Sequence, residues 1–209
     1  MEGADYRQLV GGYIFHNFSN RGVKVYTEVH VGTTIIGKDR QVDLLVLCEG
    51  NPIPMVIEAK WQLVSGTADE KIPYALQDLA ALRVPSCLAY AGPGFSRGVL
   101  NLLRGSKLGA YCYPNPENMK RGAVSRRDKG PSGRFQTWEL DHALALTFGW
   151  WDVLIGDKAA FGADDLSAAK RIVAPPTPES ARPENRRTLK RADGTMPELP
   201  LPAVKKEPA

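Results

Sequence analysis

The sequence predicts an α/β fold in which a mixed β-sheet is flanked by helices. Three observations indicate it. A helix-period segment opens the chain, three strand-like segments follow with short connections, and later strand-like segments alternate with helices. Short connections favour antiparallel neighbours, whereas strands separated by helices usually pair in parallel. A chain of 209 residues that is 43% hydrophobic is sufficient to build one core of ordinary domain size.

The first third of the chain contains the predicted opening helix and a three-strand meander. Apolar residues from Asp5 to Asn20 recur at helical spacing and predict an amphipathic helix. From Val23 to Val31 apolar and polar residues alternate, which indicates a half-buried strand. Gln41 to Cys48 is nearly all apolar and indicates a strand covered on both faces, and Met55 to Trp61 is predicted as the third strand.

The elements that follow are shorter. A helix is predicted from Tyr74 to Leu82, with Pro73 in its first turn, and Thr67 to Glu70 before it is predicted as a capped single turn or an ordered loop. The remaining predictions are a strand at Ser86–Ala91, a helix at Val99–Leu103, a strand at Leu108–Tyr113, a returning strand at Phe135–Leu140 and an aromatic-rich helix at Ala143–Ile155.

Two segments depart from the composition of a compact domain. Residues 114–134 are basic with few apolar residues and are expected to form a mobile loop. The stretch 173–209 holds half of the sixteen prolines mixed with charge, so it buries too little apolar surface to offset its ordering entropy. We therefore expect a domain over residues 1–172 and a disordered Pro-rich basic tail.

Composition narrows the classes of function. The net charge of +4 and the pI of about 9.0 suit a polyanionic partner without establishing one. The spacing of the cysteines and histidines matches no zinc pattern. The sequence has neither a long apolar span nor the basic and apolar start of a secretory signal, so we expect a cytoplasmic protein without membrane contact.

The most informative residue is Asp43, an acid inside the apolar run 42–47. An unpaired carboxylate there would cost several kcal/mol, so a positive group is expected beside it. In the next strand, period-two geometry places Glu58, Lys60 and Gln62 on one face, and the short connection should make the two strands neighbours. Two carboxylates without histidine or cysteine favour magnesium, for which manganese can substitute.

These residues resemble a known family. Gln41-Val42-Asp43 followed by Glu58-Ala59-Lys60 is similar to the core of the PD-(D/E)xK nuclease superfamily, although Gln41-Val42 replaces the motif's proline. The resemblance matches Asp43 and Glu58 to the two acids and Lys60 to the lysine. It implies a restriction-endonuclease-like fold, a divalent metal held by Asp43 and Glu58, and cleavage of DNA.

The resemblance also implies accessory residues. Members often add an acid or glutamine from the opening helix, here Glu2, Asp5 or Gln8, and Gln62 matches a glutamine near the scissile phosphate. The loop after the motif supplies Glu70 and Lys71 as candidates for substrate binding. The basic loop adds four more candidates for phosphate contact: Lys120, Arg121, Arg126 and Arg127.

The sequence therefore predicts a magnesium-dependent DNA endonuclease of the restriction type. Duplex cleavage requires two active sites, which a homodimer would supply, or two successive nicks. A Holliday-junction resolvase or a repair exonuclease would use the same centre. The alternative from another class is a catalytically inactive DNA-binding module of nuclease fold. A purely structural salt-bridge cluster across the two strands is the non-functional interpretation of Asp43, Glu58 and Lys60.

Overall fold

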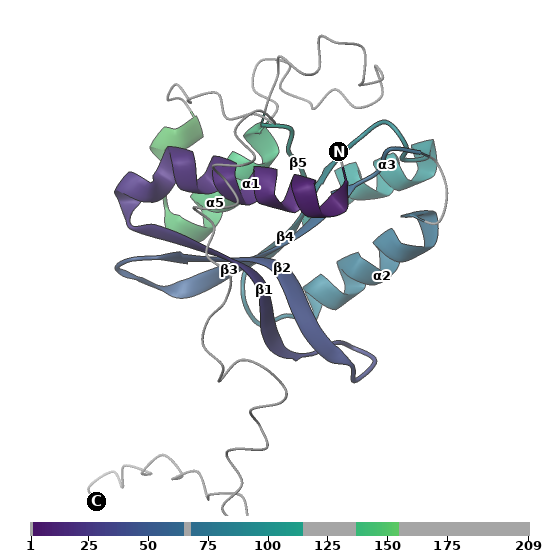
Figure 1. Ribbon diagram of the computed structural model, residues 1–209, viewed down its shortest axis with the longest axis horizontal. Helices are drawn as coiled ribbons and strands as arrows, with labels where there is room; N and C mark the ends of the chain where they lie inside the picture. The colour runs from purple at the N-terminus through teal and green to yellow at the C-terminus, as the bar shows by residue number, and fades with distance from the viewer. Residues whose placement is uncertain (1, 65–67, 115–136, 155–209) are drawn as a thin grey trace, which may run out of the picture. The chain divides into compact units, whose positions relative to one another are not determined.

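The structure, a computed structural model, describes residues 2–64, 68–114 and 137–154. Its helices and strands follow the α/β order expected from the sequence through β5 (Figure 1). In chain order they are α1 (Gly3–Phe18), the 3-10 turn η1 (Ser19–Arg21), β1 (Val23–Thr33), β2 (Asp39–Cys48), β3 (Asn51–Trp61), α2 (Ala68–Ala80), β4 (Ser86–Ala91), α3 (Arg97–Gly105), β5 (Gly109–Tyr111), α5 (Trp138–Phe148) and the 3-10 turn η4 (Trp151–Leu154).

The five strands form one mixed sheet in the order β1-β2-β3-β4-β5. The meander β1-β2-β3 is antiparallel, and β3-β4 and β4-β5 are parallel. Hairpin-length turns join the antiparallel strands, whereas each parallel pair is joined through a helix. Every residue of β4 after Ser86 is buried, as expected for a strand inside a sheet that is covered on both faces.

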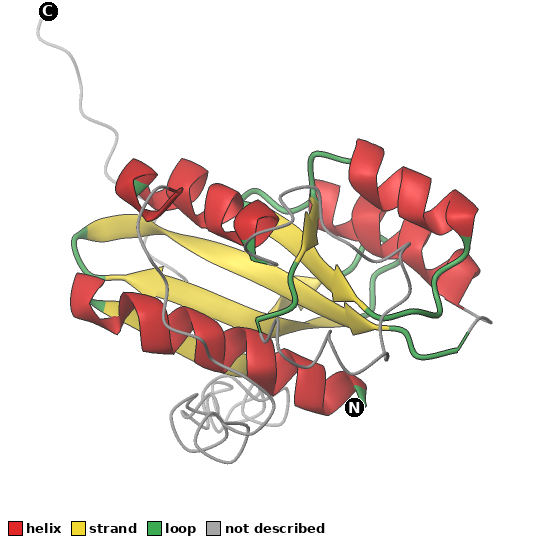
Figure 2. Ribbon diagram, turned by 90° about the horizontal axis from the view of Figure 1, so that it is seen from above, coloured by secondary structure: helices red, strands yellow, loops and turns green. Residues whose placement is uncertain are grey.

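Helices cover the two faces of the sheet in pairs (Figures 1 and 2). The α5 residue Thr147 reaches the sulfur of Met55 on β3, and α1 packs along β1 and β3. On the other face, Ser86 of β4 donates a hydrogen bond to the carbonyl of Leu79 in α2, and α2 packs beside α3. Because side chains alternate along β3, Glu58 and Lys60 lie on the face opposite Met55.

A buried polar cluster joins α1 to α5. The hydroxyl of Tyr13 in α1 lies 2.8 Å from a carboxylate oxygen of Asp141 and 2.9 Å from the hydroxyl of Thr137. Asp141 is fully buried and also accepts a hydrogen bond from Thr137 at 3.0 Å. Burial and the charge of Asp141 raise the pKa of Tyr13 well above its usual value, so the phenol remains a donor to the carboxylate.

The structure corrects the predicted strand at Phe135–Leu140 and the predicted helix at Ala143–Ile155. A single helix, α5, begins at Trp138 and ends at Phe148, where Gly149 adopts a positive φ of 77°. Its buried residues recur at helical spacing from its first turn onward: Leu140, Asp141, Leu144, Ala145 and Phe148. Alternation over so few residues suggests a strand, but the segment is too short to distinguish the period of a strand from that of a helix.

The prediction for the segment after β3 is also corrected. A single helix, α2, runs from Ala68 to Ala80 with Pro73 inside it, in place of a capped turn and a separate helix from Tyr74. Proline at this position removes one backbone hydrogen bond but tolerates helical φ. Buried Ile72, Leu76 and Leu79 hold the helix against the sheet on both sides of the proline.

The remaining predictions about organisation concern the loop at 114–134 and the tail at 173–209, which, apart from Pro114, lie outside the described residues. The expected domain boundary after residue 172 lies there too. Among the described helices, none has the length and apolar character needed to cross a membrane.

Candidate active site

Asp43 lies where β2 and β3 separate. Counted from the β2–β3 turn, the last paired residues are Leu44 and Ile57, and the next step of the same register would place Asp43 opposite Glu58. The pairing of the two strands ends here. The backbone amide of Ala59 donates its hydrogen bond to the side chain of Asp43, at 2.9 Å from Oδ2. The fork thus directs the carboxylate toward β3 and fixes one of its oxygens.

Lys60 lies between the two carboxylates. Its Nζ is 3.0 Å from Oε2 of Glu58 and 3.6 Å from Oδ2 of Asp43. The side chains of Asp43 and Glu58 are only 22% and 18% exposed, so the group is partly shielded yet open to solvent. The structure therefore brings together the two acids and the lysine that the sequence singled out.

The charges at this cluster perturb one another. Burial and the negative charge of Asp43 raise the pKa of the Glu58 carboxyl group, although Lys60 opposes the rise. Burial alone would lower the pKa of Lys60, but the carboxylates of Glu58 and Asp43 outweigh that effect and raise it. Lys60 is consequently held as an ammonium ion at neutral pH, able to donate hydrogen bonds and to neutralise negative charge.

Sequence reasoning missed a second cation, Arg7 of α1. Its Nη1 lies 3.4 Å from Oδ1 of Asp43, and its Nη2 lies 3.0 Å from Oε1 of Glu28 on β1. Arg7 is separated from Asp43 by 36 positions in the chain. A lone arginine in an amphipathic helix carries no signal of such a contact, and Glu28 is one of several polar residues that alternate with apolar ones along its strand.

The three opening-helix candidates lie at different positions before and along α1. Glu2 precedes α1, is exposed, and accepts a backbone hydrogen bond from Tyr6 through its carbonyl. Asp5 lies in the first turn of α1 and is partly buried. Oε1 of Gln8 is buried and has no hydrogen-bond partner within the described part of the chain.

The accessory candidates are more dispersed. Gln62 follows β3, and its side-chain amide donates to the carbonyl of Val64 at 2.5 Å, so its observed contact is with the chain beyond the strand. Glu70 and Lys71 are exposed near the beginning of α2. The other predicted substrate contacts lie outside the described residues: Lys120, Arg121, Arg126 and Arg127.

The donor set fits a hard divalent cation. Magnesium is commonly held by one or two protein carboxylates and keeps several water molecules, and Asp43 and Glu58 offer two carboxylates at one point. Burial and the charge of Asp43 raise the pKa of Glu58, and a bound cation would favour the ionised carboxylate. Within residues 2–64, 68–114 and 137–154, no three acidic, histidine or cysteine side chains form a complete metal site by themselves.

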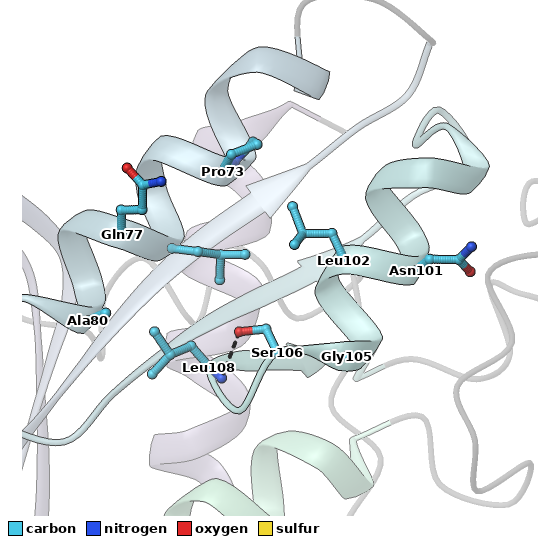
Figure 3. Close-up of a pocket in the computed structure, with 9 residues that line it drawn as sticks. Pro73, Gln77, Ala80, Asn101, Leu102, Gly105, Ser106 and Leu108 are labelled. Carbon is cyan, nitrogen blue, oxygen red and sulfur yellow. Dashed lines mark hydrogen bonds between the residues drawn. The ribbon is translucent and has the colours of Figure 1, made fainter.

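A groove of about 550 Å³ lies away from this cluster, between α2 and α3 (Figure 3). Ser106 lies in it, and its hydroxyl accepts a hydrogen bond from the amide of Leu108 at 3.1 Å. None of the nine lining residues is charged: Pro73, Leu76, Gln77, Ala80, Asn101, Leu102, Gly105, Ser106 and Leu108. The groove therefore lacks the acids and bases that hydrolysis requires.

Of three comparisons with known proteins, the match to a family model identifies the superfamily of the chain. No curated protein is significantly similar to the chain. The crystal structure of a protein of unknown function aligns with 79% of this chain, and the alignment covers 97% of the chain of that protein. The sequence identity is 14% and the TM-score is 0.35. A family model described as a PD-(D/E)XK nuclease superfamily domain matches residues 2–151, well over half of the chain. The match includes both acids and the lysine, and the chain belongs to the PD-(D/E)XK nuclease superfamily.

Proposed function

We propose that the protein is a magnesium-dependent DNA endonuclease of the restriction type whose centre is Asp43, Glu58 and Lys60. One observation carries the proposal: the ammonium of Lys60 lies within 3.6 Å of Asp43 and 3.0 Å of Glu58 at the fork between two strands. Two carboxylates with an ammonium on one partly shielded surface suit phosphodiester hydrolysis better than structural stabilisation, because ion pairs in such positions contribute little net stability.

The roles of the three residues follow from their contacts. Asp43 and Glu58 would hold the divalent ion, which supplies Lewis-acid stabilisation of charge on phosphate and lowers the pKa of bound water. The amide of Ala59 keeps Asp43 oriented toward β3. Lys60, held as an ammonium, orients the attacking water and neutralises charge that develops on the phosphate during in-line attack.

Residues outside the centre would contact the DNA. Gln62 assists at the scissile phosphate once substrate is present, and Glu70 and Lys71 contact the substrate from α2. The net charge of +4 supports a polyanionic substrate, and the basic loop at 114–134 and the tail after residue 172 are its proposed electrostatic contacts. A homodimer would supply the second active site needed for a double-strand break.

The first test compares Asp43→Asn with the wild-type protein on supercoiled plasmid DNA. We expect nicking with magnesium, none with a chelator, and a fall of at least about 100-fold in the variant, because losing about 3 kcal/mol of transition-state stabilisation has that effect. Asp39→Asn is the matched control, since Asp39 is an exposed acid at the start of the same strand. Equal metal-dependent nicking by Asp43→Asn would contradict the assignment.

Substrate form separates the related activities. An endonuclease converts supercoiled circles to nicked and linear forms, an exonuclease requires a free end, and a resolvase prefers branched DNA. A DNA-binding module would retain DNA affinity in chelator and leave every substrate intact. Parallel assays on circular, linear and four-way DNA therefore distinguish the proposal from its alternatives.

A further inference from the structure

Glu28 has a backbone conformation that residues other than glycine rarely adopt. Its φ is 55°, although it lies within strand β1. The left-handed region costs a residue with a Cβ about 1–2 kcal/mol, and such conformations concentrate at functional sites. The flanking pairs are Thr27 with Leu44 and Val29 with Val42, so Glu28 is opposite Asp43. The strained residue is therefore the direct neighbour of a proposed metal ligand.

The same register extends to the third strand. Glu28, Asp43 and Glu58 form one row across β1, β2 and β3, and a cation is interposed at each step. Arg7 contacts Glu28 and Asp43, and Lys60 contacts Asp43 and Glu58. Three carboxylates against two cations leave one formal negative charge in the row.

Arg7 is held more closely by Glu28 than by Asp43. The guanidinium lies 3.0 Å from Glu28 and 3.4 Å from Oδ1 of Asp43. The other oxygen of Asp43, Oδ2, already accepts the amide of Ala59 and faces Lys60. Among the described residues, Oδ1 accepts a hydrogen bond only from Arg7, and that bond is long. Oδ1 is therefore the oxygen with capacity for a metal ion, and how tightly Arg7 binds it decides whether the ion can bind.

Resting on the proposed function, we propose that Glu28 is a positioning residue: its ion pair with Arg7 keeps the contact between Arg7 and Asp43 long, so that the divalent ion can take Oδ1. Arg7 is largely buried, with a side chain 17% exposed, so its charge needs a partner. Without the carboxylate of Glu28, the guanidinium has Asp43 as its acidic partner and closes on it. A cation bound at Oδ1 then competes with the metal for the same oxygen.

The test measures Mn²⁺ binding by isothermal titration calorimetry on the full chain at fixed pH without DNA. Glu28→Gln should weaken binding by about 10-fold, within the usual range for residues that orient a metal ligand. Adding Arg7→Gln to that variant should restore affinity to near the wild-type value, because the competing cation is gone. Glu49→Gln, an exposed acid just beyond β2, is the control and should bind Mn²⁺ as the wild type does.

Two outcomes overturn the inference. If Glu28→Gln binds Mn²⁺ normally, Glu28 does not control access to Asp43. If the double variant is as weak as Glu28→Gln alone, Glu28 acts as a ligand itself. Should Glu28→Gln fail to fold in thermal unfolding, Glu28→Asp replaces it, with weakened binding that Arg7→Gln again restores. Failure of the wild type to bind Mn²⁺ in an Asp43-dependent way would instead contradict the proposed function.

Discussion

At the scale of single residues, the site depends on how one buried acid is satisfied. Asp43 lies in an apolar strand and is only 22% exposed, yet it has an amide donor and two cations around it. The partners come from two elements: Ala59 and Lys60 from the neighbouring strand, and Arg7 from the opening helix. The carboxylate thereby remains compatible with burial.

Gly92 provides a residue-scale prediction about the end of the strands that carry the site. It follows β4 with a φ of 118°, and an added Cβ would lie 2.2 Å from the carbonyl oxygen of Gln62. Gly92→Ala should lower the free energy of unfolding by more than about 1 kcal/mol, because both the backbone conformation and the close approach exclude a side chain. Urea unfolding followed by circular dichroism measures the change.

Gly105→Ala is the matched control for that substitution. A Cβ at Gly105 meets nothing within 4 Å, and this residue ends helix α3 without a positive φ. Its free energy of unfolding should stay the same or rise by about 0.5 kcal/mol, since alanine reduces the entropy of the unfolded chain. Equal urea midpoints for Gly92→Ala and Gly105→Ala would show that the space between Gly92 and the carbonyl of Gln62 can accommodate a Cβ.

At the scale of elements, α2 is tied to the beginning of β2 by one ion pair. Arg40 donates to both carboxylate oxygens of Asp78, at 2.9 and 2.6 Å, and their side chains are 9% and 14% exposed. Asp78 also accepts the amide of Ile35 from the β1–β2 turn. Burial opposes ionisation of Asp78, but hydrogen bonds from Arg40 and Ile35 outweigh it and lower the pKa of the carboxyl group.

This ion pair gives a prediction with a defined pH dependence. The pKa of Asp78 is lower in the folded protein than in the unfolded chain, so the stabilisation is complete above the unfolded value of about 3.9 and is lost as pH falls through the folded value. Arg40→Met should lower the free energy of unfolding by about 2 kcal/mol at pH 7. The difference from wild type should remain constant down to about pH 5 and shrink below about pH 4.

Urea titrations of both proteins over that pH range provide the measurement. Lys38→Met, a cation exposed in the nearby turn, controls for the general effect of removing a positive charge. If the free energies of unfolding of Arg40→Met and the wild type differed by the same amount from pH 7 to pH 3, Asp78 would not be the group whose titration removes the stabilisation.

At the scale of the whole molecule, the proposed metal site links ligand binding to folding. Asp43 and Glu58 converge only in the folded sheet, so a cation held there stabilises the folded state by mass action. Magnesium at about 100 times its dissociation constant should add about 2.7 kcal/mol to the free energy of unfolding. For a domain of this size, that corresponds to a rise of about 5–10 °C in Tm.

Differential scanning calorimetry with magnesium, and again after chelation, measures this rise. It should disappear in Asp43→Asn and persist in Asp39→Asn, because only the first of these acids faces Glu58. An identical rise in both variants would indicate that magnesium acts at another place on the protein.

The elements differed in how well their local sequence predicted them. The meander and β4 were predicted because strand alternation and buried apolar runs are properties of a few adjacent residues. The boundaries of α2 and α5 were not, since Pro73 and a short alternating run suggested ends that tertiary packing overrode. Helix limits depend on which residues find a surface to cover, and that surface comes from distant parts of the chain.

By itself, the sequence determined the order of elements through β5, the mixed sheet, and the expectation that Asp43 has a positive neighbour on the strand bearing Glu58 and Lys60. These follow from local periodicity and the cost of burying a charge. Only the tertiary structure decided that Arg7 reaches Asp43 and that Glu28 holds it. The pairing of three strands and the packing of α1 bring those side chains together, and local spacing contains no information about contacts between segments so far apart.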